Sequence, residues 1–139
     1  MMIAFVVDDN VQNIMMFRDA LEMARFHVES VGDGLDALNW LELNPAPNLI
    51  MLDINLPHYD GKQIYTQLRN KDKYADCPII IATANRYMAD QVEAIKHPQD
   101  FIMMKPINLI EIQRIAVKIR RAHEEAPTVP QHASTESKD

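Results

Sequence analysis

The sequence predicts an α/β fold in which one doubly wound sheet of parallel strands lies between two layers of helices, as a three-layer sandwich. Short apolar or β-branched runs alternate along the chain with segments of helical period, which is typical of repeated βαβ units. Two of these runs show almost no polar alternation, as expected for strands that helices cover on both faces. Glycine and proline stand in the gaps between the segments.

The apolar runs predict strands at Ile3–Val7, His27–Val31, Leu49–Asp53, Pro78–Thr83 and Phe101–Met104. The helical patterns predict helices at Val11–Ala24, Gly34–Leu43, Lys62–Asn70, Met88–Lys96 and Leu109–Glu124. Residues 1–123 are therefore expected to form one domain. Residues 124–139 contain proline, serine, threonine and charges but little apolar content, which predicts a disordered tail or a linker.

Composition narrows the class of protein. The 139 residues suit a single domain, and 14 basic against 20 acidic residues give a net charge of −6, which argues against a general nucleic-acid-binding surface. The only cysteine, Cys77, cannot form an internal disulfide. The apolar stretch from Met1 to Val7 lacks a basic n-region and stops at two aspartates. We expect neither a signal peptide nor a membrane span, and a reducing cytoplasm as the compartment.

Polar residues stand where the predicted strands end. Asp8 and Asp9 follow the first strand, Asp53 closes the third, Thr83 closes the fourth and Lys105 follows the fifth. Because the carboxyl ends of parallel strands share one edge of the sheet, these side chains are expected to meet there. Clustered carboxylates with few dedicated ligands suit Mg²⁺, and a lysine with a hydroxyl suits a phosphoryl group.

Each residue also has a simpler interpretation. Asp8, Asp9 and Asn10 could cap the first helix, where aspartate and asparagine are favoured. Thr83 could be an ordinary strand residue, and Lys105 a solvated surface lysine. Asp53 could be a turn residue, although a carboxylate that closes a buried strand is costly for that purpose alone.

Taken in order, several motifs resemble the receiver domain of two-component response regulators, including the chemotaxis receivers. The motifs are Asp8-Asp9-Asn10, the segment from Leu52 to Pro57 followed by Gly61, Thr83-Ala84, and Lys105-Pro106. The resemblance covers about residues 2–123. It implies a flavodoxin-like (βα)5 fold with strand order 2-1-3-4-5, and in this family a cis bond precedes the proline of the last motif.

The resemblance implies a phosphotransfer that the domain catalyses on itself, with autodephosphorylation, rather than a conventional enzyme. Asp53 would accept a phosphoryl group from a phosphohistidine on a histidine kinase or histidine phosphotransfer protein, or from a small phosphodonor. Asp9 and Asp53 would bind Mg²⁺ through side chains, Asn55 through its backbone carbonyl and Asp8 through water. The downstream target is not identified.

Lys105 and Thr83 would complete the site, the first by stabilising charge during transfer and the second by a hydrogen bond to the phosphorylated state. Receivers usually carry an aromatic switch residue three positions before the lysine, where this chain has Ile102. The neighbouring Phe101 should project to the other side of the strand, because side chains alternate. We therefore expect no aromatic rotation, and a response shifted toward the pocket loops and the helix start near Tyr87.

Two residues of the first helix are candidates for partner docking. Helical spacing places an apolar stripe inward, which leaves Ile14 and Met15 facing outward near Asp9. In the family the corresponding helix contacts the phosphodonor protein. Isolated apolar residues are also common on surfaces, so this pair has a simple alternative explanation.

The sequence is also compatible with two other functions. The chain could be a receiver-like interaction module that acts without phosphorylation, although such modules would be expected to lose acidic or lysine residues that are kept here. It could also be the amino-terminal receiver of a larger regulator whose output domain is absent. A phosphatase with an aspartyl nucleophile is disfavoured, because its usual second aspartate is replaced by Asn55.

Overall fold

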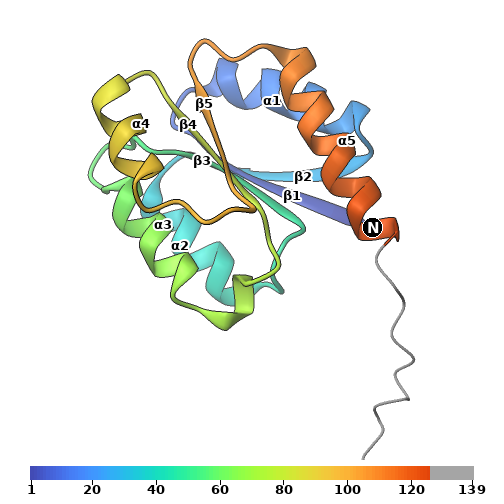
Figure 1. Cartoon of the computed structure of the whole chain (residues 1–139), viewed down its shortest axis with the longest axis horizontal. Coiled ribbons are helices and arrows are strands. Elements are labelled where there is room, and N and C mark those ends of the chain that lie inside the picture. Colours follow the sequence, from blue (N-terminus) through green and yellow to red (C-terminus); the bar gives the residue numbers. More distant parts are fainter. Residues whose placement is uncertain (126–139) are drawn as a thin grey trace, which may run out of the picture.

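The computed structural model describes residues 1–125 and contains one parallel sheet of five strands. The strand order is β2-β1-β3-β4-β5, as predicted, and Figure 1 shows the strands crossing the centre of the domain. The strands are β1 (Met2–Val7), β2 (Phe26–Val31), β3 (Leu49–Asp53), β4 (Ile79–Thr83) and β5 (Phe101–Met104).

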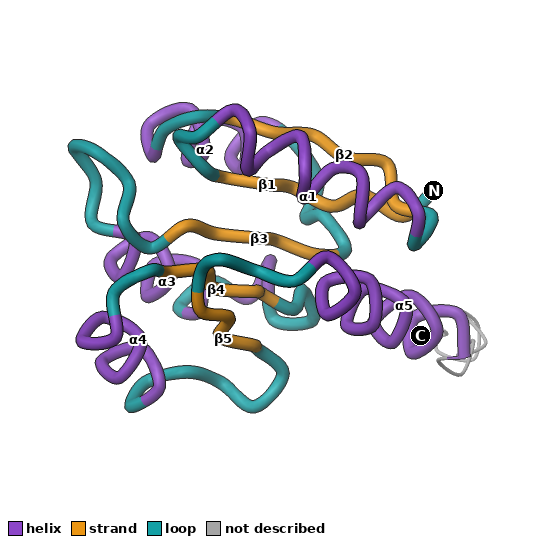
Figure 2. Tube along the Cα trace, turned by 90° about the horizontal axis from the view of Figure 1, so that it is seen from above, coloured by secondary structure: helices purple, strands orange, loops and turns teal. Residues whose placement is uncertain are grey.

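Helices cover both faces of the sheet, which confirms the predicted three layers. The helices are α1 (Val11–Met23), α2 (Gly34–Leu43), α3 (Gly61–Arg69), α4 (Arg86–Glu93) and α5 (Leu109–Glu125), with a short 3-10 helix η1 (Asp72–Tyr74). Figures 1 and 2 show α1 and α5 side by side on one face, and α2, α3 and α4 on the other. All residues of the central strands β3 and β4 are buried, as their lack of polar alternation predicted.

Each face of the sheet has its own hydrophobic core. One core joins the sheet to α1 and α5 through residues such as Phe17, Leu21 and Ile112. The other joins it to α2, α3 and α4 through residues such as Ile64 and Val92, and in this core Trp40 stacks on Phe5 with ring centroids 4.1 Å apart. The alternation of side chains along each strand divides the apolar residues between the two cores.

Most predicted boundaries are within one residue of the observed ones, and α4 differs most. Its predicted start at Met88 is wrong because the Asn85 side chain accepts a hydrogen bond from the Met88 N–H, which caps the helix at Asn85 and starts it at Arg86. The helix ends at Glu93 instead of Lys96. The 3-10 helix η1 was not predicted.

The last helix, α5, ends one residue later than predicted. The expected tail begins at Glu124, but α5 continues through Glu125. The rest of that expected tail, residues 126–139, lies outside the described residues. None of the helices in the described part has the length and apolar content that a membrane crossing requires.

A buried ion pair ties α3 to the segment before β5. The Arg69 guanidinium donates from Nη2 and Nε to the two carboxylate oxygens of Asp100, each at 2.8 Å, and both side chains are almost completely buried. Asp100 also accepts hydrogen bonds from the Ile79 N–H, at 2.8 Å, and from the Tyr65 hydroxyl. Because both buried charges have hydrogen-bond partners, this network can persist inside the domain.

Candidate functional site

The predicted polar residues meet at the carboxyl edge of the sheet. Strands β1, β3, β4 and β5 are consecutive in the sheet, so the residues at their ends become neighbours. Carboxylate oxygens of Asp8, Asp9 and Asp53 lie within 4.8 Å of one another. Asp8 and Asp53 are buried, whereas Asp9 is exposed and gives the group an opening to solvent.

Capping of α1 does not require the two aspartates. Asn10 is the N-cap, and its side chain accepts the Asn13 N–H at 2.9 Å. Asp8 uses one oxygen, Oδ1, to accept the Asn10 N–H at 2.9 Å, and its Oδ2 faces Lys105. The simple interpretation of this motif as a cap therefore accounts for Asn10 and leaves carboxylate oxygens available for the cluster.

Lys105 is the cation of the site. Its Nζ lies 3.0 Å from Asp8 Oδ2 and 3.3 Å from Asp53 Oδ2, and the side chain is only 19% exposed. The solvated-lysine interpretation is therefore wrong. Three carboxylates against one ammonium leave an excess of negative charge in a confined space, which suits a divalent cation with oxygen ligands.

Burial and nearby charges shift the pKa values of Asp53 and Lys105. Burial raises the pKa of Asp53 and the Asp8 charge adds to this, although the Asn55 N–H and Lys105 oppose it. Burial alone would lower the pKa of Lys105, but its hydrogen bond to Asp8 and the charges of both aspartates outweigh burial and raise that pKa. Lys105 therefore stays a cation, and the Asn55 N–H and Lys105 together favour the ionised form of Asp53.

The Thr83 side chain contacts the side chain of Asn55, whose backbone carbonyl is the predicted metal ligand. The Thr83 hydroxyl donates to Asn55 Oδ1 at 2.7 Å and accepts the Asn85 N–H at 3.0 Å. The Asn55 N–H in turn donates to Asp53 Oδ1 at 3.0 Å. The side-chain contact of Asn55 was missed, because 28 residues separate it from Thr83 and no sequence pattern marks such a pair.

The loop after β3 depends on Gly61. A side chain at Gly61 would bring its Cβ within 2.6 Å of the Ile54 backbone, where the Gly61 N–H donates to the Ile54 carbonyl. Only glycine permits this close approach. The contact closes the loop that holds Asp53 and Asn55 at the edge of the sheet.

The last strand has the predicted side-chain arrangement. It pairs with β4 in continuous register from Phe101 to Met104, so no register change reorients its residues. Phe101 packs against the core of α1 and α5, and Ile102 against the core of α4. Phe101 therefore does not take the place of the aromatic residue that receivers usually carry where this chain has Ile102. The Lys105–Pro106 bond is cis, as the resemblance implied.

The two docking candidates on α1 differ in exposure. Met15 is 61% exposed, as predicted, and Val11 one turn earlier is also exposed. Ile14 is half-buried and packs against the core of α1 and α5, so the prediction that it faces outward is wrong. Ile14 lies at the border of the apolar stripe, which explains its partial burial.

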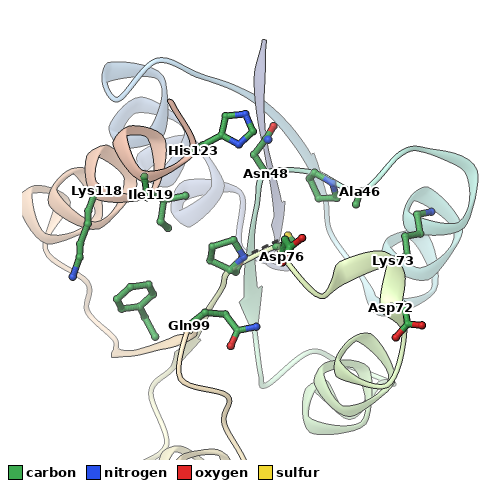
Figure 3. Close-up of a pocket in the computed structure, with 14 residues that line it drawn as sticks. Ala46, Asn48, Asp72, Lys73, Asp76, Gln99, Lys118, Ile119 and His123 are labelled. Atoms are coloured by element: carbon green, nitrogen blue, oxygen red, sulfur yellow. Dashed lines mark hydrogen bonds between the residues drawn. The ribbon is translucent and has the colours of Figure 1, made fainter. Parts of the chain in front are cut away.

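A pocket of about 610 Å³ lies at the other end of the sheet. Figure 3 shows Ile119 and His123 of α5 on one side and Asp72 and Lys73 of η1 on the other, with Asn48 before β3 between them. It is thus separated from Asp53 by the length of the strands. The residues to which the sequence assigns a chemical role lie instead around the carboxylate cluster at the carboxyl edge of the sheet.

The fold and the site are those of a known protein family. The family model described as the response regulator receiver domain matches residues 4–117. The chain belongs to this family of two-component signalling proteins.

Individual relatives agree with this assignment. The chain is 35% identical over 118 residues to hybrid signal transduction histidine kinase L of Dictyostelium discoideum, covering 81% of this chain and 7% of that protein. It is 32% identical over 117 residues to the transcriptional regulatory protein PrrA of Mycobacterium tuberculosis, covering 84% and 49%. The chain thus spans half or less of the length of these relatives. The chemotaxis response regulator CheY4 of Vibrio cholerae has the same fold, with a TM-score of 0.74, 22% identity and coverage of 86% and 98%.

Proposed function

We propose that this receiver accepts a phosphoryl group on Asp53 in a Mg²⁺-dependent reaction and thereby switches its binding to partners. The observation that carries the proposal is the position of Asp53 beside both the other two carboxylates and Lys105, with Nζ 3.3 Å from its Oδ2. Phosphoryl transfer needs mainly positioning and charge stabilisation, and this arrangement offers both.

In the proposed reaction an Asp53 carboxylate oxygen attacks the phosphorus of a phosphohistidine. The P–O bond of an aspartyl phosphate forms while the P–N bond breaks, and the ring nitrogen keeps the electron pair. Attack of water on the phosphorus later releases phosphate and restores the carboxylate. Lys105 is placed to stabilise the charge on the phosphoryl oxygens at little cost in reorganisation, since Asp8 already orients it.

The donor set fits the metal that the family uses. Asp9 and Asp53 would hold Mg²⁺ through their side chains, Asn55 through its backbone carbonyl and Asp8 through water. The carboxylate oxygens within 4.8 Å of one another support this assignment. The metal would neutralise charge on the phosphoryl oxygens.

The partners follow from the same chemistry. A histidine kinase or histidine phosphotransfer protein would supply the phosphoryl group, and a downstream protein would distinguish the two states. One relative is named a histidine kinase and another a transcriptional regulatory protein, which supports such a pathway. We place the reaction in the cytoplasm, in keeping with the single buried thiol of Cys77. Thr83 would bind the phosphoryl group without an aromatic rotation at Ile102.

Incubation with a small phosphodonor such as acetyl phosphate tests the reaction. We expect one phosphoryl group per chain in the presence of Mg²⁺, and loss of labelling with a chelator or in Asp53→Asn. Phosphate-affinity electrophoresis separates the two forms. Equal labelling of wild type and Asp53→Asn would refute the assignment, and binding of partners by a chain that is never labelled would favour the unphosphorylated interaction module.

Docking of the phosphodonor protein gives a second test. Met15→Asp should lower the rate of transfer from a phosphorylated histidine protein about tenfold or more, because a charge replaces an apolar contact. The rate with acetyl phosphate should be unchanged. Leu43→Asp, at the exposed end of α2, is the matched control and should affect neither reaction.

Met15 is preferred over Ile14 for this experiment because Ile14 also packs against the core, so a charge there would destabilise the domain. Equal loss with both phosphodonors, or no loss with either, would reject the docking role.

A further inference from the structure

The Thr83 hydroxyl is engaged both as a donor and as an acceptor. It donates to Asn55 Oδ1 at 2.7 Å and accepts the Asn85 N–H at 3.0 Å. Thr83 is completely buried at the end of β4, whereas Asn55 is exposed in the loop after β3. A hydroxyl group has a single proton to donate. While it is shared with Asn55, this proton is not available to another acceptor.

The proposed phosphorylated state needs the same proton. Asp53 pairs with Ala82 in the sheet, and the Ile54 N–H donates to the Ala82 carbonyl at 3.0 Å, so the loop after Asp53 runs alongside the end of β4. Asp53 at the end of β3 and Asn55 in the loop that follows thus both lie beside the end of β4, where a phosphoryl group on Asp53 would meet the Asn55 side chain at Thr83. They compete for one donor.

We infer that Asn55 is a positioning residue that holds Thr83 in the unphosphorylated arrangement, and that the phosphoryl group must displace its side chain to engage the hydroxyl. The inference rests on the proposed function. Asn55 then opposes the switch, because each activation breaks a hydrogen bond before the Thr83 contact forms. Its backbone carbonyl, which is the group assigned to the metal, has no part in this competition.

Removal of the side chain should therefore favour the activated state. In Asn55→Ala the Thr83 proton keeps only the distant Asn85 carbonyl, at 3.5 Å, as a protein acceptor. The affinity for beryllofluoride, a mimic of the phosphoryl group on aspartate, should therefore rise about fivefold, the ratio expected for one net hydrogen bond. Asn55 is exposed, so the variant is expected to fold.

The test is a double-mutant cycle at Asn55 and Thr83. Fluorine NMR titrations in saturating Mg²⁺ give the beryllofluoride affinities of wild type, Asn55→Ala, Thr83→Ala and the double variant. We expect the gain on removing the Asn55 side chain only where Thr83 is present. In Asn55→Ala without the mimic, the Thr83 methyl signal should already move toward its mimic-bound position, a change that a purely structural role would not produce.

The outcomes separate this inference from the proposed function. An equal gain in the Thr83→Ala background, or no gain in either background, would overturn the role of Asn55 while leaving phosphorylation at Asp53 intact. Failure of the wild-type chain to bind beryllofluoride would overturn the proposed function and this inference with it.

Discussion

Replacing Asp100 with alanine is expected to lower the free energy of unfolding by about 3–5 kcal/mol. The substitution would leave the buried Arg69 guanidinium without its bidentate partner, and would remove the acceptor of the Ile79 N–H and the Tyr65 hydroxyl. A buried charge without a partner costs far more than the loss of an exposed ion pair. Urea unfolding followed by circular dichroism measures the difference.

Glu93→Ala is the control for this prediction. Glu93 is exposed and pairs with Lys96 at 4.0 Å, and its removal should cost less than about 1 kcal/mol. A similarly small loss in Asp100→Ala would show that the network contributes little to stability. Asp100 lies before β5, at the opposite end of the strand from Lys105, so the fraction of the variant that stays folded should still react with acetyl phosphate.

The second large effect is expected at Lys105. Lys105→Ala should slow phosphorylation by acetyl phosphate about 10²- to 10³-fold, the range for loss of one preorganised donor to a developing charge. Binding of Mg²⁺ should become tighter, because the substitution removes a cation that lies 3.0 Å and 3.3 Å from carboxylates of the cluster. Initial rates and a Mg²⁺ titration measure the two effects separately.

Slower phosphorylation together with tighter Mg²⁺ binding in Lys105→Ala would identify a direct electrostatic role for Lys105. Lys118→Ala, which removes an exposed lysine of α5, should change neither quantity. A rate for Lys105→Ala within about twofold of wild type, or a slow rate that comes with weaker Mg²⁺ binding, would contradict a direct electrostatic role.

The sequence predicted the sheet and the cluster of charges because both depend on local patterns. Apolar runs such as Leu49–Asp53 mark buried strands, and the polar residue at the end of each parallel strand must reach the same edge of the sheet.

Such patterns do not predict contacts that depend on the path of a loop or on the exact rotation of a helix. The pairs Thr83–Asn55 and Arg69–Asp100 join residues 28 and 31 positions apart, and no periodicity links them. Ile14 illustrates the second case, because a residue at the border of an apolar stripe is covered or exposed according to how α1 tilts toward its neighbours.

Chemical trapping of the phosphorylated chain tests the central claim most directly. Sodium borohydride reduces an acyl phosphate to a primary alcohol, so the phosphorylated aspartate becomes homoserine, which peptide mass spectrometry locates. After treatment with acetyl phosphate and Mg²⁺, we predict homoserine at position 53 and none when Mg²⁺ is withheld. Homoserine at Asp8 or Asp9, or an unmodified Asp53 in a chain that has gained a phosphoryl group, would contradict the assignment of Asp53 as the acceptor.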